Sequence, residues 1–221
     1  ILVLIGVAVC FIASAQVKTT YKKYEHVISR SGYTADQVAY MILRNAGITD
    51  VSIHHIPGDL TDNYNPREHT LNLSDKVYGS RSIAAIGVAA HECGHAIQHA
   101  RHYVPLTVRS AIIPAANIGS SFAWPLVLIG LIIPRLNFCM TIGILLFSLV
   151  VILQLVTLPV EFNASRRAIQ IIRDSGYLAP DELKGAKSVL KAAAMTYVAA
   201  MVSVSLQLLR LVILRNSRDD N

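Results

Sequence analysis

The chain has 221 residues, of which 53% are hydrophobic and 15% are charged, and its formal net charge is +6. A chain that is more than half apolar with so few charges is typical of a membrane protein. Its three cysteines are an odd number and form no Cys-x-x-Cys pair, so the composition excludes a disulfide framework. No base-reading motif or interleaved aromatic patch accompanies the basic charge, so we expect no nucleic-acid partner.

The first apolar segment covers residues 1–16, slightly fewer than the ~20 that cross a bilayer. We interpret it as a transmembrane helix and expect residues before Ile1, because the chain does not begin with methionine. A signal-peptide core is the alternative, but no basic region precedes the segment and no clear cleavage site follows.

Residues 17–111 have the character of a soluble domain with a short β-sheet. Thr34 and Gln37 predict a helix start with a capping box. Residues 51–56 alternate enough to predict a strand, and residues 70–74 predict a second one. We expect this second strand to pair with an extended peptide by strand addition.

A helix predicted from about Arg81 to Arg101, with Ser80 as its cap, carries the most informative motif. Residues four apart lie on one helix face, so His91 and His95 direct two imidazoles at one point. Glu92 stands beside the first, where it can polarise a water molecule at a metal. This is the His-Glu-x-x-His pattern of zinc hydrolases. Two surface histidines are the alternative, but the surrounding small apolar residues favour a packed helix.

A hydrolytic zinc ion usually has three protein ligands and one open position. His99 lies about 12 Å along the helix axis from His91, too far to share one ion with it. The extended metzincin pattern also fails, because Gln98 and Arg101 occupy the positions of its glycine and histidine. The third ligand must therefore come from another part of the chain.

Three further apolar runs cover residues 112–133, 138–158 and 192–214, and each is long enough to cross a bilayer. Buried core helices are the alternative, but three such runs in one small chain favour membrane helices. In the connecting segment 159–191, Glu161 is the first charge after a long apolar run. We predict Glu161 as the third metal ligand. The alternative is a helix-start acid favoured by the helix dipole.

The chain resembles the membrane zinc metallopeptidases of the YugP type, a bacterial family in the wider gluzincin group. The resemblance covers nearly the whole chain and rests on residues 83–99, 154–162 and 193–199. The chain is more distantly similar to the HtpX-type membrane proteases, which also place hydrophobic spans between the helix motif and a later glutamate ligand.

The resemblance implies a Zn²⁺ cofactor and a catalytic base, Glu92. The implied zinc ligands are His91, His95 and Glu161. Four residues after the ligand glutamate, the gluzincin pattern usually has an aspartate that supports a histidine. Here that position is Ser165, and Asn163 is the nearest other polar residue, so these two are the expected supports of the metal ligands.

We therefore predict a mainly α membrane protein, with about four transmembrane helices and a small α+β zincin-like catalytic domain that contains a short β-sheet. If all four apolar runs cross, residues 17–111 and 159–191 share one side of the bilayer, and this side carries sixteen of the twenty Lys and Arg. By the positive-inside tendency, the catalytic side of this integral bacterial membrane protein is cytoplasmic.

The expected function is zinc-dependent hydrolysis of peptide bonds in a peptide or protein substrate. Zinc lowers the pKa of its water and polarises a carbonyl group. Glu92 would take the proton of the water and pass it to the leaving amine. Tyr197, Arg166 and His99 are the candidates for oxyanion stabilisation or substrate contact.

Two other interpretations stay open. An intramembrane protease of the site-2 type also uses His-Glu-x-x-His, but it places the motif inside a spanning helix, whereas Arg81 and Arg101 bracket it here. A non-catalytic membrane scaffold with a structural zinc ion needs four protein ligands, and His99 or Asn163 would supply the fourth.

Overall fold

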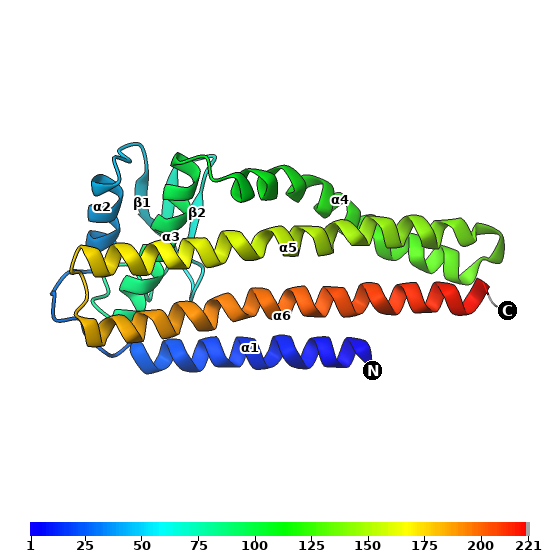
Figure 1. Ribbon diagram of the computed structural model, residues 1–221, viewed down its shortest axis with the longest axis horizontal. Helices are drawn as coiled ribbons and strands as arrows, with labels where there is room; N and C mark the ends of the chain where they lie inside the picture. Colours follow the sequence, from blue (N-terminus) through cyan, green and yellow to red (C-terminus); the bar gives the residue numbers. More distant parts are fainter. Residues whose placement is uncertain (220–221) are drawn as a thin grey trace. The chain divides into compact units, whose positions relative to one another are not determined.

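The computed structural model describes residues 1–219, which contain six α-helices, one short 3₁₀-helix and three β-strands (Figure 1). In chain order the elements are α1 (Leu2–Tyr24), α2 (Ala35–Asn45), β1 (Ser52–His55), β2 (Asn63–Asn65), β3 (Thr70–Leu73), α3 (Ile83–Ala100), α4 (Val104–Ile132), the 3₁₀-helix η1 (Pro134–Leu136), α5 (Asn137–Asp174) and α6 (Pro180–Asp219). The predicted mainly α architecture with a small sheet is confirmed.

Four helices, α1, α4, α5 and α6, are long and apolar enough to cross a membrane. They contain the four apolar runs of the sequence, so the predicted number of membrane helices is confirmed. Helix α4 keeps Pro114 and Pro125 in its interior. Membrane helices tolerate such prolines, because neighbouring helices and polar side chains satisfy the freed backbone groups.

Helix α5 continues beyond the apolar run 138–158 and ends only at Asp174. Glu161 therefore lies in the interior of a long helix. The alternative interpretation of this residue as a helix-start acid is wrong, because no helix begins near it.

The chain divides into two compact units. The unit that we call the membrane unit comprises residues 1–13, 104–159 and those from 196 onward. Its apolar core gathers side chains from α4, α5 and α6, among them Ala123, Val127, Met140, Ile144, Phe147 and Leu211. The other unit, which we call the sheet unit, comprises residues 14–103 and 160–195.

The sheet unit contains a three-stranded sheet in the order β1-β3-β2. Strand β3 runs parallel to β1, with Ser52 opposite Thr70, and antiparallel to β2, with Tyr64 opposite Leu71. The central strand β3 therefore has a partner on both sides. The prediction that this strand accepts an extended peptide is wrong, because only β1 and β2 lie at edges of the sheet.

Helix α3 forms the centre of the sheet unit, where it packs against α2 and against buried side chains of α5 and α6. It begins at Ile83, and its cap is Ser82, whose hydroxyl accepts a hydrogen bond from the backbone N–H of Ala85 at 3.1 Å. The predicted cap, Ser80, is two residues too early. Its hydroxyl donates instead to the hydroxyl of Ser82 at 3.2 Å, so it supports the cap without being the cap.

The predicted helix start at Thr34 is confirmed, because Thr34 is the N-cap of α2. The side-chain oxygen of Gln37 accepts a hydrogen bond from the backbone N–H of Thr34 at 3.0 Å. This bond is one half of a capping box, and it satisfies a backbone donor at the helix start.

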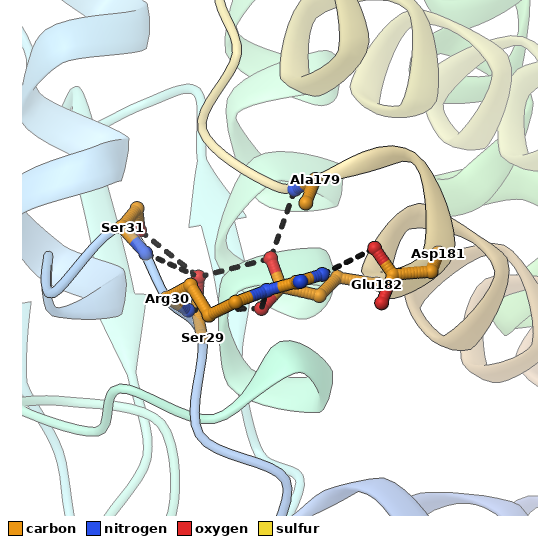
Figure 2. A network of polar contacts seen from close by, with 6 residues as sticks. All are labelled: Ser29, Arg30, Ser31, Ala179, Asp181 and Glu182. Carbon is orange, nitrogen blue, oxygen red and sulfur yellow. Dashed lines mark hydrogen bonds and ion pairs between the residues drawn. The ribbon is translucent and has the colours of Figure 1, made fainter.

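The start of α6 is tied to the segment that follows α1 by the buried carboxylate of Glu182 (Figure 2). This carboxylate accepts hydrogen bonds from the backbone N–H of Ala179 (2.8 Å) and from the backbone N–H and Nε of Arg30 (2.9 and 3.1 Å). Arg30 also forms an ion pair with Asp181, which is exposed. One acid thus caps the helix and fixes the segment around Arg30.

Replacing Glu182 by Ala should lower the free energy of unfolding by about 1–3 kcal/mol, because it leaves two backbone N–H groups without their buried acceptor. Asp181→Ala is the matched control, since it removes an exposed carboxylate from the same guanidinium and should leave stability almost unchanged. Thermal unfolding of the purified protein in detergent measures both. Equal melting temperatures for the two variants would contradict the structural role of Glu182.

Candidate metal centre

Helix α3 and helix α5 together present three metal-ligating side chains. His91 and His95 lie four residues apart on α3, and their rings meet edge to face with centroids 4.7 Å apart. From α5, a carboxylate oxygen of Glu161 lies 3.3 Å from His91 Nε2 and 3.6 Å from His95 Nε2. One ligand atom from each of the three residues lies within 4.8 Å of the other two.

This spacing fits a tetrahedral zinc ion. Bonds of about 2.0–2.1 Å to imidazole nitrogen and carboxylate oxygen place neighbouring ligand atoms about 3.4 Å apart. The two nitrogen–oxygen distances of 3.3 and 3.6 Å bracket that value. The chemistry of the donor set fits as well, because two imidazoles and one carboxylate are a ligand set of hydrolytic zinc sites.

Gln98 fixes the proton on His95. Its amide Nε2 donates to the backbone carbonyl of Val160 (2.8 Å) and to Asn163 Oδ1 (3.0 Å), so its oxygen is the atom that faces His95 Nδ1 at 3.1 Å. Nδ1 must therefore carry a proton, and the Nε2 lone pair of the neutral ring points at the Glu161 carboxylate. With a neutral ring two acceptors face one another, and either a proton or a metal ion between them resolves the conflict.

Ser165 supports the other histidine. Its hydroxyl lies 3.1 Å from His91 Nδ1, which leaves Nε2 of that ring facing the carboxylate. A serine hydroxyl thus occupies the place where the gluzincin pattern has an aspartate. Asn163 holds Gln98 and also accepts a hydrogen bond from Arg167 Nε at 2.7 Å, so it acts on the histidine pair through Gln98.

The two helices approach each other at Gly94. A Cβ at this position would lie 2.7 Å from the backbone oxygen of Ala164 on α5, which is closer than side chains allow. Only glycine permits this approach, since it has no Cβ. The glycine inside the motif therefore lets the carboxylate of Glu161 reach the two imidazoles.

The side chain of Glu92 is almost fully enclosed, with 8% of the residue exposed. Burial raises the pKa of its carboxyl, and the neighbouring rings of His91 and His95 lower it in part. For His95, burial lowers the pKa, but the carboxylates of Glu161 and Glu92 outweigh this effect and the net pKa is raised. A buried carboxylate beside two imidazoles has the environment of a proton-transfer group.

The other predicted contact residues lie in different surroundings. Arg166 is exposed on α5. Tyr197 belongs to the membrane unit, where it lines a cavity of about 520 Å³ together with Arg109 and other residues of α4, α5 and α6. His99 belongs to the sheet unit, and its Nδ1 lies 2.9 Å from the hydroxyl of Tyr64.

Sequence reasoning missed the role of Gln98, which is fully buried. Its position three residues after His95, on the same helix face, is the sequence signal that could have identified this role. Tyr64 was also missed, because nothing in the sequence indicated strand β2.

Comparison with known proteins agrees with the predicted resemblance. The model of the family described as "Putative neutral zinc metallopeptidase" matches residues 1–216. "Putative membrane protease YugP" from Bacillus subtilis (strain 168) is 44% identical over 221 residues, which cover 100% of this chain and 98% of that protein. No solved structure matches the chain.

Gly94→Ala should lower the melting temperature and weaken divalent-metal binding, because the added Cβ forces α3 away from Ala164 and moves the histidines relative to Glu161. Gly87→Ala is the control on the same helix. Its Cβ would meet the Cβ of Ala186 at 3.3 Å, a tight contact that a shift of a few tenths of an ångström relieves, and alanine improves helix propensity by up to about 1 kcal/mol. Because Gly87 does not face α5 beside the histidines, its variant should keep full zinc content.

Thermal unfolding and zinc content, measured side by side for the two glycine variants, check this prediction. Full zinc content and an unchanged melting temperature in Gly94→Ala would show that the close approach is not required.

Proposed function

The chain belongs to the family described as "Putative neutral zinc metallopeptidase", and on that basis we propose that it is a membrane-bound, zinc-dependent endopeptidase. The observation that carries the proposal is the convergence of His91, His95 and Glu161, with Glu92 enclosed next to the first histidine. The relative from Bacillus subtilis is named a membrane protease, and it is similar over the whole chain.

In the proposed reaction, His91, His95 and Glu161 hold the zinc ion. Zinc bound there supplies a Lewis acid that polarises the scissile carbonyl and lowers the pKa of water. Glu92 accepts a proton from the attacking water and delivers it to the leaving amine. Burial raises the pKa of Glu92, which strengthens it as a base and keeps the transferred proton near the reacting atoms.

The geometry favours a hydrolytic site over a structural one. A structural zinc ion takes four protein ligands. His99 and Asn163 are the candidates for a fourth protein ligand. His99 is not among the residues whose ligand atoms converge. Asn163 has its oxygen engaged by Gln98 and Arg167. Three side chains among the described residues converge, which leaves one tetrahedral position for water and substrate.

The position of the His-Glu-x-x-His motif also argues against an intramembrane protease, which would place the motif inside a membrane-spanning helix. Helix α3 has 18 residues and is not one of the candidate spans among the described helices. It packs against the sheet, α2 and the parts of α5 and α6 that belong to the sheet unit. The sheet and α2 expose polar side chains, among them Gln37, Arg44 and His54. We propose that this unit acts on peptide or protein substrates at the cytoplasmic side, where sixteen of the twenty basic residues would lie.

Glu161→Ala should reduce the zinc content of the purified protein from about one ion per chain to almost none, because two histidines alone do not complete the site. Asp174→Ala removes an exposed acid from the same helix and should leave zinc content unchanged. Elemental analysis after dialysis measures both variants. Full zinc occupancy in Glu161→Ala would remove this residue from the ligand set.

Glu92→Gln should keep zinc at the wild-type level and lower the rate of cleavage of a casein-type substrate by about 10²–10⁴-fold, because the amide cannot accept the proton. Zinc content and cleavage are measured on the same preparation. A variant that cleaves as fast as the parent would show that another group is the base.

A further inference from the structure

We propose that Tyr64, His69 and His99 form a substrate-contacting site beside the metal centre, and that this site hydrogen-bonds the backbone of the bound peptide, with His99 donating to a carbonyl and His69 accepting from an N–H. The inference rests on the proposed peptidase function and assigns a subsite to it. None of the three residues belongs to the group of metal ligands.

The three side chains come together from three elements of the sheet unit. His99 is on α3, Tyr64 is on β2, and His69 is in the turn between β2 and β3. The Tyr64 hydroxyl lies 2.9 Å from His99 Nδ1, and the rings of His69 and His99 meet edge to face with centroids 5.5 Å apart. Asp50 fixes the ring of His69 through Nδ1 at 2.5 Å.

The backbone of His69 is strained. Its φ is +52°, in the left-handed region that residues other than glycine rarely adopt. The turn is held in place, because the His69 carbonyl accepts a hydrogen bond from the N–H of Ser52 at 3.0 Å. Glycine would meet the same backbone demand without strain. In this turn the ring of His69 is held between Asp50 and the ring of His99.

The cluster offers one hydrogen-bond donor and one acceptor. Burial raises the pKa of Tyr64, so its hydroxyl stays protonated and can donate to His99 Nδ1. The proton of a neutral His99 ring then sits on Nε2 and is directed away from Tyr64. In His69, Asp50 accepts the proton of Nδ1, so Nε2 of the neutral ring is a hydrogen-bond acceptor, and the side chain is 42% exposed. The peptide backbone supplies the matching carbonyl acceptors and N–H donors.

The position of His99 on α3 determines how far from the scissile bond the site contacts the substrate. His99 follows His95 by one helical turn, about 6 Å along the axis. For an extended peptide that runs along α3 and advances about 3.3 Å per residue, the contacted carbonyl would lie about two residues from the scissile bond. Tyr64 belongs to β2, an edge strand of the sheet, which leaves this side of the cluster free of a further strand.

The first experiment uses zinc-loaded His69→Gly in the Glu92→Gln background, where peptide binding is measured without cleavage. We expect unchanged zinc content, an equal or higher melting temperature because the strain is relieved, and about tenfold weaker binding of a casein-derived peptide. His102→Gly is the control, since His102 has a φ of +49° and its replacement relieves the same kind of strain. It should leave peptide affinity unchanged.

The second experiment compares His99→Asn and Tyr64→Phe with the parent on peptides shortened from either end. Both variants should bind the full-length peptide more weakly, and this loss should disappear when the peptide ends within two residues of the scissile bond on one side. Equal affinity of the parent and His69→Gly, with zinc retained, would overturn the inference and leave the proposed function intact. Absence of zinc, or cleavage by Glu92→Gln, would overturn the proposed function itself.

Discussion

The proposed metal centre depends on the close approach of α3 and α5 at Gly94 and Ala164. Two histidines on one helix can direct their rings at a common point, but the third side chain of the group, Glu161, lies seventy residues after His91 in the chain. A carboxylate that far along the chain reaches the imidazoles only where the two helix backbones nearly touch. Glycine at position 94 permits that contact, since any Cβ there would collide with the Ala164 carbonyl.

Polar groups stabilise the same contact. Gln98 on α3 donates hydrogen bonds to α5, and its oxygen holds the ring of His95. One buried amide therefore joins the helices and sets the protonated nitrogen of a ligand. On the other ring, the hydroxyl of Ser165 lies 3.1 Å from Nδ1 of His91. A neutral hydroxyl adds no negative charge there, so Glu92 and Glu161 are the carboxylates that act on the histidine pair.

Much of this arrangement could be predicted from the sequence. The four apolar runs indicated the long helices, and the spacing of His91 and His95 with the lone Glu161 indicated which residues would meet, because periodicity and span length are local properties. Gln98 and Tyr64 were harder to find, since their roles arise from contacts with α5 and with α3 respectively. The order of the sheet was also beyond the sequence, because β2 has three residues and carries no strong pattern.

X-ray absorption at the zinc edge of the purified protein identifies the ligands of the bound ion. A site built from His91, His95 and Glu161 gives nitrogen and oxygen ligands at about 2.0–2.1 Å, with the scattering pattern of two imidazoles and no sulfur. A third imidazole would place another histidine on the metal, and a sulfur ligand at about 2.3 Å would implicate a cysteine. Either result would contradict a site built from His91, His95 and Glu161.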